Sequence, residues 1–228
     1  MDYLKLRNED LVNNPTARVP ICLCLDVSGS MAGEPIQELN EGIRMFYDSI
    51  KNDETAKYAA EICIVTFGGN SAREVCDFAS VEIQPEAPTL QPDGRTPMGE
   101  AVNLALELLE NRKNEYKKAG VDYYQPWLVL MTDGYPNGSP YELESSINKT
   151  VSMIENRKLT IFPIGIGREA DMNTLNRYSP KRPALRLKGL NFSEFFDWLS
   201  KSVSRTSQSI PGEKVPLDIE AIKGWGEL

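Results

Sequence analysis

The 228-residue sequence contains no histidine. Because imidazole is the usual base of a nucleophilic triad and a common zinc ligand, this absence excludes His-dependent triads and His-ligated zinc sites. It also disfavours the transition metals that prefer nitrogen ligands. A metal site in this chain would therefore use mainly oxygen-bearing side chains.

Cysteine is scarce as well, with four residues in the chain, Cys22, Cys24, Cys63 and Cys76. Cys22 and Cys24 alternate within an apolar run, so they share one face of an expected strand. A redox or metal-binding pair is one interpretation, but a second pair at matching spacing is missing. The pattern favours small apolar residues inside a reduced protein.

Long hydrophobic runs and excess positive charge are also missing. The net charge is -8, which disfavours nucleic acid or an anionic membrane as the main partner. No apolar run approaches the length that spans a bilayer, and the first ten residues, MDYLKLRNED, lack a hydrophobic signal region. We therefore expect a cytoplasmic protein without nucleic-acid or membrane partners.

The apolar residues, 41% of the chain, form two alternating kinds of pattern. Continuous apolar runs predict buried strands at 19–25, 58–67, 127–132 and 159–166, with shorter strands at 73–78, 81–84 and 184–187. Apolar stripes at helical spacing predict helices over 36–50, 98–109, 143–154, 171–177 and 192–203. This order predicts an α/β, Rossmann-like, doubly wound fold: a mainly parallel sheet with helices on both faces and one short antiparallel edge strand.

The same patterns divide the chain into three segments. We expect an N-terminal extension over residues 1–17, one α/β domain over 18–206 and a C-terminal tail over 207–228. The tail carries Trp225 and several apolar residues, namely Val215, Leu217, Ile219 and Ile222. It either docks on another protein or folds back over its own domain, and the sequence favours neither.

Oxygen-bearing side chains follow two of the expected strands. Asp26 ends the first strand and precedes Ser28 and Ser30, whereas Asp133 ends the strand over 127–132. Thr96 opens a helix after a Pro- and Gly-rich loop. Because the carboxyl ends of parallel strands meet at one edge, these five side chains are expected to gather there. Two carboxylates and three hydroxyls suit Mg²⁺; Mn²⁺ would be tolerated, and Ca²⁺ usually takes more ligands.

Each of these residues also has an ordinary structural interpretation. Thr96 before Pro97 is a good helix N-cap, and Asp133 with Gly134 is a frequent turn pair. Asp93 fits either an outer acidic group of the site or a solvated turn residue. The metal-site interpretation therefore depends on the joint occurrence of the five residues.

The segments around these residues resemble von Willebrand factor type A (VWA) domains. DVSGS, from Asp26 to Ser30, matches the Asp-x-Ser-x-Ser motif of their metal-ion-dependent adhesion site (MIDAS), and GRTPMGEAVNLAL and LVLMTDGYPNG supply Thr96 and Asp133. The resemblance covers about residues 18–205. It implies that Ser28, Ser30 and Thr96 contact the metal directly, that Asp26 and Asp133 act mostly through water, and that a Glu or Asp carboxylate of a protein partner completes the coordination.

A narrower resemblance is to the bacterial cytoplasmic tellurium-resistance Y type. The shared wording is LCLDVSGSM, GRTPMGEA, LMTDG and the late Gly224-Trp225. This resemblance implies a role in a stress or tellurite-resistance cluster. A PP2C-type phosphatase and a Ser/Thr protein kinase would then be neighbours and possible partners of the protein.

These residues are compatible with three functions from different classes. The first is a non-enzymatic, metal-dependent module that recruits acidic protein partners. The second is a metal-dependent phosphatase or hydrolase with Asp26 as nucleophile, although Ser28 stands where such an enzyme would carry a second carboxylate, and a phosphate-loop signature is missing. The third is a scaffold that acts through its tail and keeps a vestigial metal site. The first is favoured, and no enzymatic activity is expected.

Overall fold

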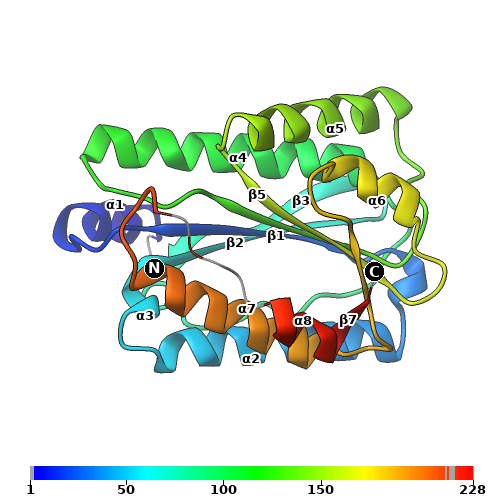
Figure 1. Cartoon of the computed structure of the whole chain (residues 1–228), viewed down its shortest axis with the longest axis horizontal. Coiled ribbons are helices and arrows are strands. Elements are labelled where there is room, and N and C mark those ends of the chain that lie inside the picture. Colours follow the sequence, from blue (N-terminus) through cyan, green and yellow to red (C-terminus); the bar gives the residue numbers. More distant parts are fainter. Residues whose placement is uncertain (1–2, 214, 216–218, 228) are drawn as a thin grey trace.

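A seven-stranded sheet runs through the computed structural model, which describes residues 3–213, 215 and 219–227 (Figure 1). The strand order is β3-β2-β1-β4-β5-β6-β7. Its strands are β1 (Val19–Asp26), β2 (Ala60–Gly68), β3 (Ser71–Ser80), β4 (Trp127–Thr132), β5 (Thr160–Ile166), β6 (Leu185–Leu187) and β7 (Gly226–Glu227). The five strands from β2 to β6 in this order are parallel, whereas β3 and β7 run antiparallel at the two edges.

Helices cover both faces of this sheet. They are α1 (Tyr3–Asn13), the 3-10 helix η1 (Gly29–Met31), α2 (Glu34–Asn52), α3 (Ala56–Ala59), α4 (Met98–Ala119), α5 (Pro140–Glu155), α6 (Met172–Tyr178), α7 (Phe192–Ser207) and α8 (Ile219–Trp225). Figure 1 shows α4 and α5 on one face and α2 and α7 on the other. The predicted fold class, a mainly parallel sheet between two helical layers, is confirmed. Antiparallel strands lie at both edges of the sheet, the ten-residue β3 and the two-residue β7.

The central strand shows why the apolar runs fold in this way. All eight residues of β1 are buried, because helices pack against both faces of the strand. Ile21 and Leu23 face the core with α2 and α7, whereas Cys22 and Cys24 face the core with α4. All four cysteines are free and buried, so in the described structure they serve as small apolar core residues.

Helices α2 and α7 approach each other closely at Gly42. A Cβ atom at Gly42 would lie 2.6 Å from a ring carbon of Phe196, so a larger residue would push the helices apart. The apolar stripe of α2 is buried along its length against this partner. The core on this side therefore depends on one small residue as well as on the aromatic side chains of α7.

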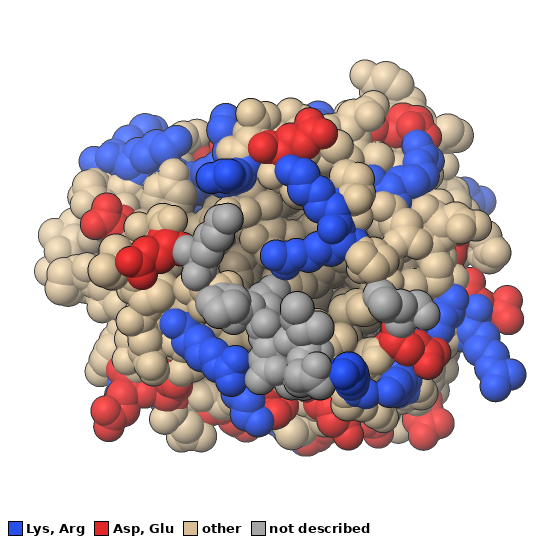
Figure 2. All heavy atoms as spheres, viewed as in Figure 1, with Lys and Arg blue, Asp and Glu red and all other residues tan. Residues whose placement is uncertain are grey.

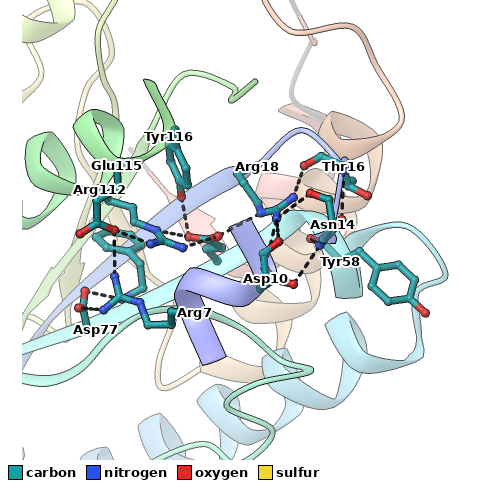
Figure 3. A network of polar contacts seen from close by, with 12 residues as sticks. Arg7, Asp10, Asn14, Thr16, Arg18, Tyr58, Asp77, Arg112, Glu115 and Tyr116 are labelled. Carbon is teal, nitrogen blue, oxygen red and sulfur yellow. Dashed lines mark hydrogen bonds and ion pairs between the residues drawn. The ribbon is translucent and has the colours of Figure 1, made fainter. Parts of the chain in front are cut away.

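A buried ion cluster joins the amino ends of β1 and β2 to α4 (Figure 3). The Glu61 carboxylate accepts hydrogen bonds from Nε of Arg18 at 3.1 Å, from Nε and Nη2 of Arg112 at 2.6 and 2.8 Å, and from the Tyr116 hydroxyl at 2.6 Å. Arg18 and Glu61 are fully buried. Arg18 also donates to backbone oxygens of Asp10 and Asn14, so the cluster fixes the end of α1 as well.

The C-terminal segment folds back on the domain. Trp225 is 1% exposed, and its ring lies 5.0 Å from that of Phe195 and 5.3 Å from that of Trp198, between centroids. Residue 226 pairs with Leu187 of β6. The sequence left two roles for the tail, docking on another protein or folding back over its own domain. The described residues of the tail fold back over the domain. Leu217 lies outside the described residues. The division into 1–17, 18–206 and 207–228 stays a prediction.

The surface carries both signs of charge. On the face in Figure 2, Asp and Glu side chains line the lower border, while Lys and Arg lie around a hollow near the middle. This face differs from the continuous basic surface that binds a phosphate backbone. Within the described part of the chain, no helix is both long and apolar enough to cross a membrane.

Candidate metal centre

Asp26 is fixed at the carboxyl end of β1 by two hydrogen bonds. Its Oδ1 accepts from the backbone N–H of Ser28 at 2.7 Å, and its Oδ2 accepts from the Thr132 hydroxyl at 2.5 Å. The side chain is completely buried. Because β1 and β4 are neighbours in the sheet, Asp26 and Thr132 lie at adjacent strand ends. The carboxylate therefore has one defined position.

The two serines extend this arrangement toward Asp133. The hydroxyl oxygens of Ser28 and Ser30 lie 3.0 Å apart, and the Ser30 hydroxyl donates to Oδ1 of Asp133 at 2.8 Å. Ser28 has extended backbone angles and leads directly into η1, which turns Ser30 back toward the strand end. Four of the five predicted site residues thus form one continuous hydrogen-bonded group.

Thr96 is held between the two strand ends through its backbone. Its N–H donates to Oδ1 of Asn137 at 2.7 Å, and the Asn137 N–H donates to the Thr96 carbonyl at 3.1 Å. On the other side, the Gly29 N–H donates to the Gly94 carbonyl at 3.0 Å. Thr96 is 6% exposed. The alternative role of Thr96 as a helix N-cap is wrong, because Pro97 holds that position and α4 has no side-chain cap bond.

The loop that carries Thr96 needs glycine at position 94. Gly94 has a φ of 55°, and a Cβ atom there would lie 2.5 Å from Cα of Gly69. Only glycine permits both this angle and this approach. Asp93, one residue earlier, has a 64% exposed side chain 3.6 Å from Arg73, which agrees with its interpretation as a solvated turn residue.

The two carboxylates of the group lie close together in a partly desolvated setting. Burial, together with the nearby Asp133 carboxylate, raises the pKa of Asp26 to about 6, against hydrogen bonds from Ser28 and Thr132 that lower it. Burial also raises the pKa of Asp133. Within the described residues neither carboxylate forms a salt bridge with a lysine or arginine. A bound cation would remove the cost of placing these two charges together.

The donor set fits a small hard cation. Two carboxylates and three hydroxyls are oxygen ligands of the kind that Mg²⁺ accepts while it keeps several waters, whereas Ca²⁺ usually takes more ligands. The separations of 3.0 Å between the Ser28 and Ser30 hydroxyls and 2.8 Å between Ser30 and Asp133 are those of ordinary hydrogen bonds. The described residues contain no group of three Cys, Asp or Glu side chains able to hold a metal. This is expected, because the group here has two carboxylates and its other donors are hydroxyls.

Two residues of the site were missed in the sequence, Thr132 and Asn137. Thr132 orients Asp26, and Asn137 clamps the backbone of Thr96. Thr132 directly precedes Asp133, so its position next to a predicted ligand was a usable signal. Asn137 had no comparable signal, because only the folded loops bring it to Thr96.

The model of the von Willebrand factor type A domain matches residues 21–194, which is most of the chain. The chain belongs to the VWA domain family. Inter-alpha-trypsin inhibitor heavy chain H2 of Mus musculus is 27% identical over 169 residues, which cover 70% of this chain and 16% of the relative. Heavy chain H4 of Sus scrofa is 28% identical over 154 residues, which cover 64% of this chain and 15% of the relative. This VWA chain thus spans about a sixth of the length of these relatives.

Solved structures agree on the VWA fold. The von Willebrand factor type A protein of Catenulispora acidiphila matches with a TM-score of 0.63 and 16% identity, over 83% of this chain and 43% of that one. Manganese-loaded TRAP protein of Plasmodium vivax matches with a TM-score of 0.50 and 24% identity, over 73% of this chain and 64% of that one. At these identities the likeness shows the VWA fold alone. VWA domains in general serve as protein-binding modules, often with a divalent metal.

Proposed function

We propose that this VWA protein is a divalent-metal-dependent protein-binding module. In it Ser28, Ser30 and Thr96 contact the metal directly, and Asp26 and Asp133 act mostly through water. A Glu or Asp carboxylate from a protein partner takes the open coordination position. The observation that carries this proposal is the grouping of the buried Asp26 carboxylate and the half-buried Asp133 carboxylate, which are joined through serine hydroxyls and lack a basic partner among the described residues.

We propose Mg²⁺ as the metal. The set of two carboxylates and three hydroxyls leaves room for the several waters that Mg²⁺ usually keeps, whereas Ca²⁺ usually takes more protein ligands. Mn²⁺ prefers similar oxygen ligands, and a related VWA structure, that of Plasmodium vivax TRAP, is manganese-loaded. When bound, the ion supplies a Lewis-acidic position for one carboxylate of the partner, while the residues of the chain orient that ion.

The arrangement favours binding over catalysis. Asp26 is fully buried and both of its oxygens already accept hydrogen bonds, so it is poorly placed to attack a phosphoryl group. A histidine base is missing from the whole sequence. The tail-based alternative is disfavoured by the burial of Trp225 against α7.

The resemblance to the tellurium-resistance Y type adds a narrower proposal. Under this narrower proposal the protein acts in the cytoplasm, within a stress or tellurite-resistance cluster, with a PP2C-type phosphatase or a Ser/Thr protein kinase as partner. This part is supported only by the wording of LCLDVSGSM, GRTPMGEA and LMTDG. The relatives reported above are mammalian inter-alpha-trypsin inhibitor heavy chains, and they neither support nor replace it.

Affinity capture with and without metal tests the proposed function. Immobilised wild-type protein should retain one or more partner proteins from a lysate of the source organism in 5 mM Mg²⁺ and release them in EDTA. The S28A/S30A variant should retain none, because it lacks two of the three direct hydroxyl ligands. The exposed Ser152 on α5 offers a matched control, and S152A should behave as wild type. Identical capture in Mg²⁺, in EDTA and by S28A/S30A would contradict the proposal.

A further inference from the structure

We infer that a second recognition surface flanks the metal site and selects partners with an extended acidic segment. This surface, the tyrosine–arginine rim, consists of Arg95, Tyr135, Tyr141 and Arg168. The segment it fits carries an aliphatic residue or proline beside the metal-binding carboxylate and a second acidic residue within a few positions. The inference rests on the proposed function, because the metal anchors the first carboxylate.

The four residues all belong to loops or helix starts at the carboxyl edge of the parallel strands. Arg95 directly precedes Thr96, and Tyr135 follows Asp133 by two residues. The loop of Arg168 is attached to the same place, because the Asp171 N–H donates to the Gly134 carbonyl at 3.4 Å. A partner that reaches the metal would therefore lie over these loops.

The two tyrosines are unusually exposed for aromatic residues. Tyr135 is 67% exposed and Tyr141 is 78% exposed, and both lie in the short stretch YPNGSPY. Neither hydroxyl forms a hydrogen bond within the described part of the chain. Tyrosine offers a large apolar ring together with a polar end, and it is enriched among the residues that dominate binding energy at interfaces.

The loop that presents the tyrosines is held in place from both sides. Asn137 exchanges two hydrogen bonds with the backbone of Thr96, and the Ser139 side chain accepts from the Glu142 N–H at the start of α5. A Cβ atom at Gly138 would lie 3.1 Å from Cα of Pro97, so the two loops are in close contact. A surface fixed before binding loses less conformational entropy when a partner docks.

The net negative charge of the protein disfavours the approach of an acidic partner, and exposed arginines near the site offset this. The chain has a net charge of -8, and the two carboxylates of Asp26 and Asp133 balance a divalent ion. An acidic partner is therefore repelled by the protein as a whole unless local positive charge offsets this repulsion. Arg95 and Arg168 are exposed, and neither guanidinium forms an ion pair among the described residues.

Two other surface arginines, Arg73 and Arg177, differ in this respect. Arg73 lies 3.6 Å from Asp93, and Arg177 forms a 2.6 Å ion pair with Glu144. Their charge is already balanced by a neighbouring carboxylate, whereas Arg95 and Arg168 can still meet a carboxylate of a partner. The rim thus adds charge and aromatic contact area to a metal site that supplies one coordination position.

Peptide selection tests the inference with a defined probe. A phage library of random 12-residue peptides with a fixed central glutamate is selected on the full-length protein in Mg²⁺, and enriched peptides are synthesised. We expect them to need Mg²⁺, and to carry a second acidic residue and a proline or aliphatic residue within three positions of the fixed glutamate. Enriched peptides whose flanking residues are random would overturn the inference.

Four variants then separate the rim from the metal site. R95Q/R168Q and Y135S/Y141S should each weaken peptide binding at least tenfold, and R95Q/R168Q should also reduce its salt dependence. Their Mg²⁺ affinity should stay within threefold of wild type by calorimetry. The controls R157Q and Y58S change an exposed arginine and a partly exposed tyrosine outside the rim, and should have less than a twofold effect.

The outcomes distinguish this inference from the proposed function. Peptides that require Mg²⁺ but bind both rim variants as tightly as wild type would contradict the rim and leave the metal-dependent function supported. A protein that binds Mg²⁺ yet enriches no Mg²⁺-dependent peptide would contradict the proposed function and the rim together.

Discussion

Asparagine in place of Asp26 removes the stabilisation of the protein by Mg²⁺ and, without metal, makes the protein more stable at pH 7.5. Burial raises the pKa of Asp26 from 3.8 to about 6 in the folded state, so the ionised carboxylate disfavours folding at pH 7.5. The raised pKa corresponds to about 1–3 kcal/mol, which D26N recovers in part. Below pH 6 Asp26 becomes protonated in the folded state, so the gain shrinks as the pH falls toward 3.8 and disappears well below that value.

Chemical denaturation of wild type and D26N measures this effect at pH 7.5 and pH 4, with EDTA and with 5 mM Mg²⁺. Wild type should gain stability from Mg²⁺ at pH 7.5, and D26N should gain less than about 0.3 kcal/mol because its metal affinity falls at least a hundredfold. Asp48 is an exposed carboxylate on α2, and D48N is the matched control with wild-type behaviour. An equal Mg²⁺ response in D26N and wild type would show that Asp26 does not hold the metal.

Glutamine in place of Glu61 lowers the free energy of unfolding by about 3–5 kcal/mol. The substitution keeps the shape of the side chain but leaves the buried guanidinium groups of Arg18 and Arg112 without their shared negative charge. The Tyr116 hydroxyl also loses a charged acceptor. Urea denaturation at pH 7.5 measures the loss. The Kd for Mg²⁺ of the folded E61Q fraction should match wild type, since Glu61 lies near the amino ends of the parallel strands and Asp26 at their carboxyl ends.

Glu115 provides the control for this prediction. It forms an ion pair with Arg112 as well, but its side chain is 41% exposed. E115Q should therefore cost less than about 1 kcal/mol. If E61Q were as stable as E115Q, the buried cluster would contribute little to the fold. If E61Q bound Mg²⁺ more weakly than wild type, the two ends of the sheet would be coupled.

The sheet and the grouping of four candidate site residues at one edge were predictable because their signals are local. The run VPICLCLD is apolar at nearly every position, as a strand covered on both faces requires, and it ends in the aspartate that begins DVSGS. Asp26, Ser28, Ser30 and Asp133 come together because adjacent parallel strands end at one edge. Strand ends therefore predict the site without knowledge of the connecting loops.

The features that were not predicted depend on contacts between distant segments. Helix α1 was missed because its sequence, YLKLRNEDLVN, has a weak apolar stripe. Arg7 of this helix pairs with Asp77 and Glu115 far along the chain, and Arg18 links the end of the helix to Glu61. The sequence shows Glu61 as a charged residue within the apolar run YAAEICIVTF. It does not show the two arginines that bind its carboxylate, because they lie 43 and 51 residues away along the chain. Asn137 meets Thr96 only after both loops fold.

A crystal structure of the protein grown with Mn²⁺ tests the central claim most directly. Anomalous scattering identifies Mn²⁺ without reliance on its ligands, and Mn²⁺ accepts the oxygen ligands that suit Mg²⁺. The account predicts one strong anomalous peak among Ser28, Ser30 and Thr96, about 2.2 Å from each hydroxyl oxygen, with Asp26 and Asp133 around it. A fully occupied Mn²⁺ elsewhere on the protein, with no peak beside Asp26 and Ser28, would contradict it.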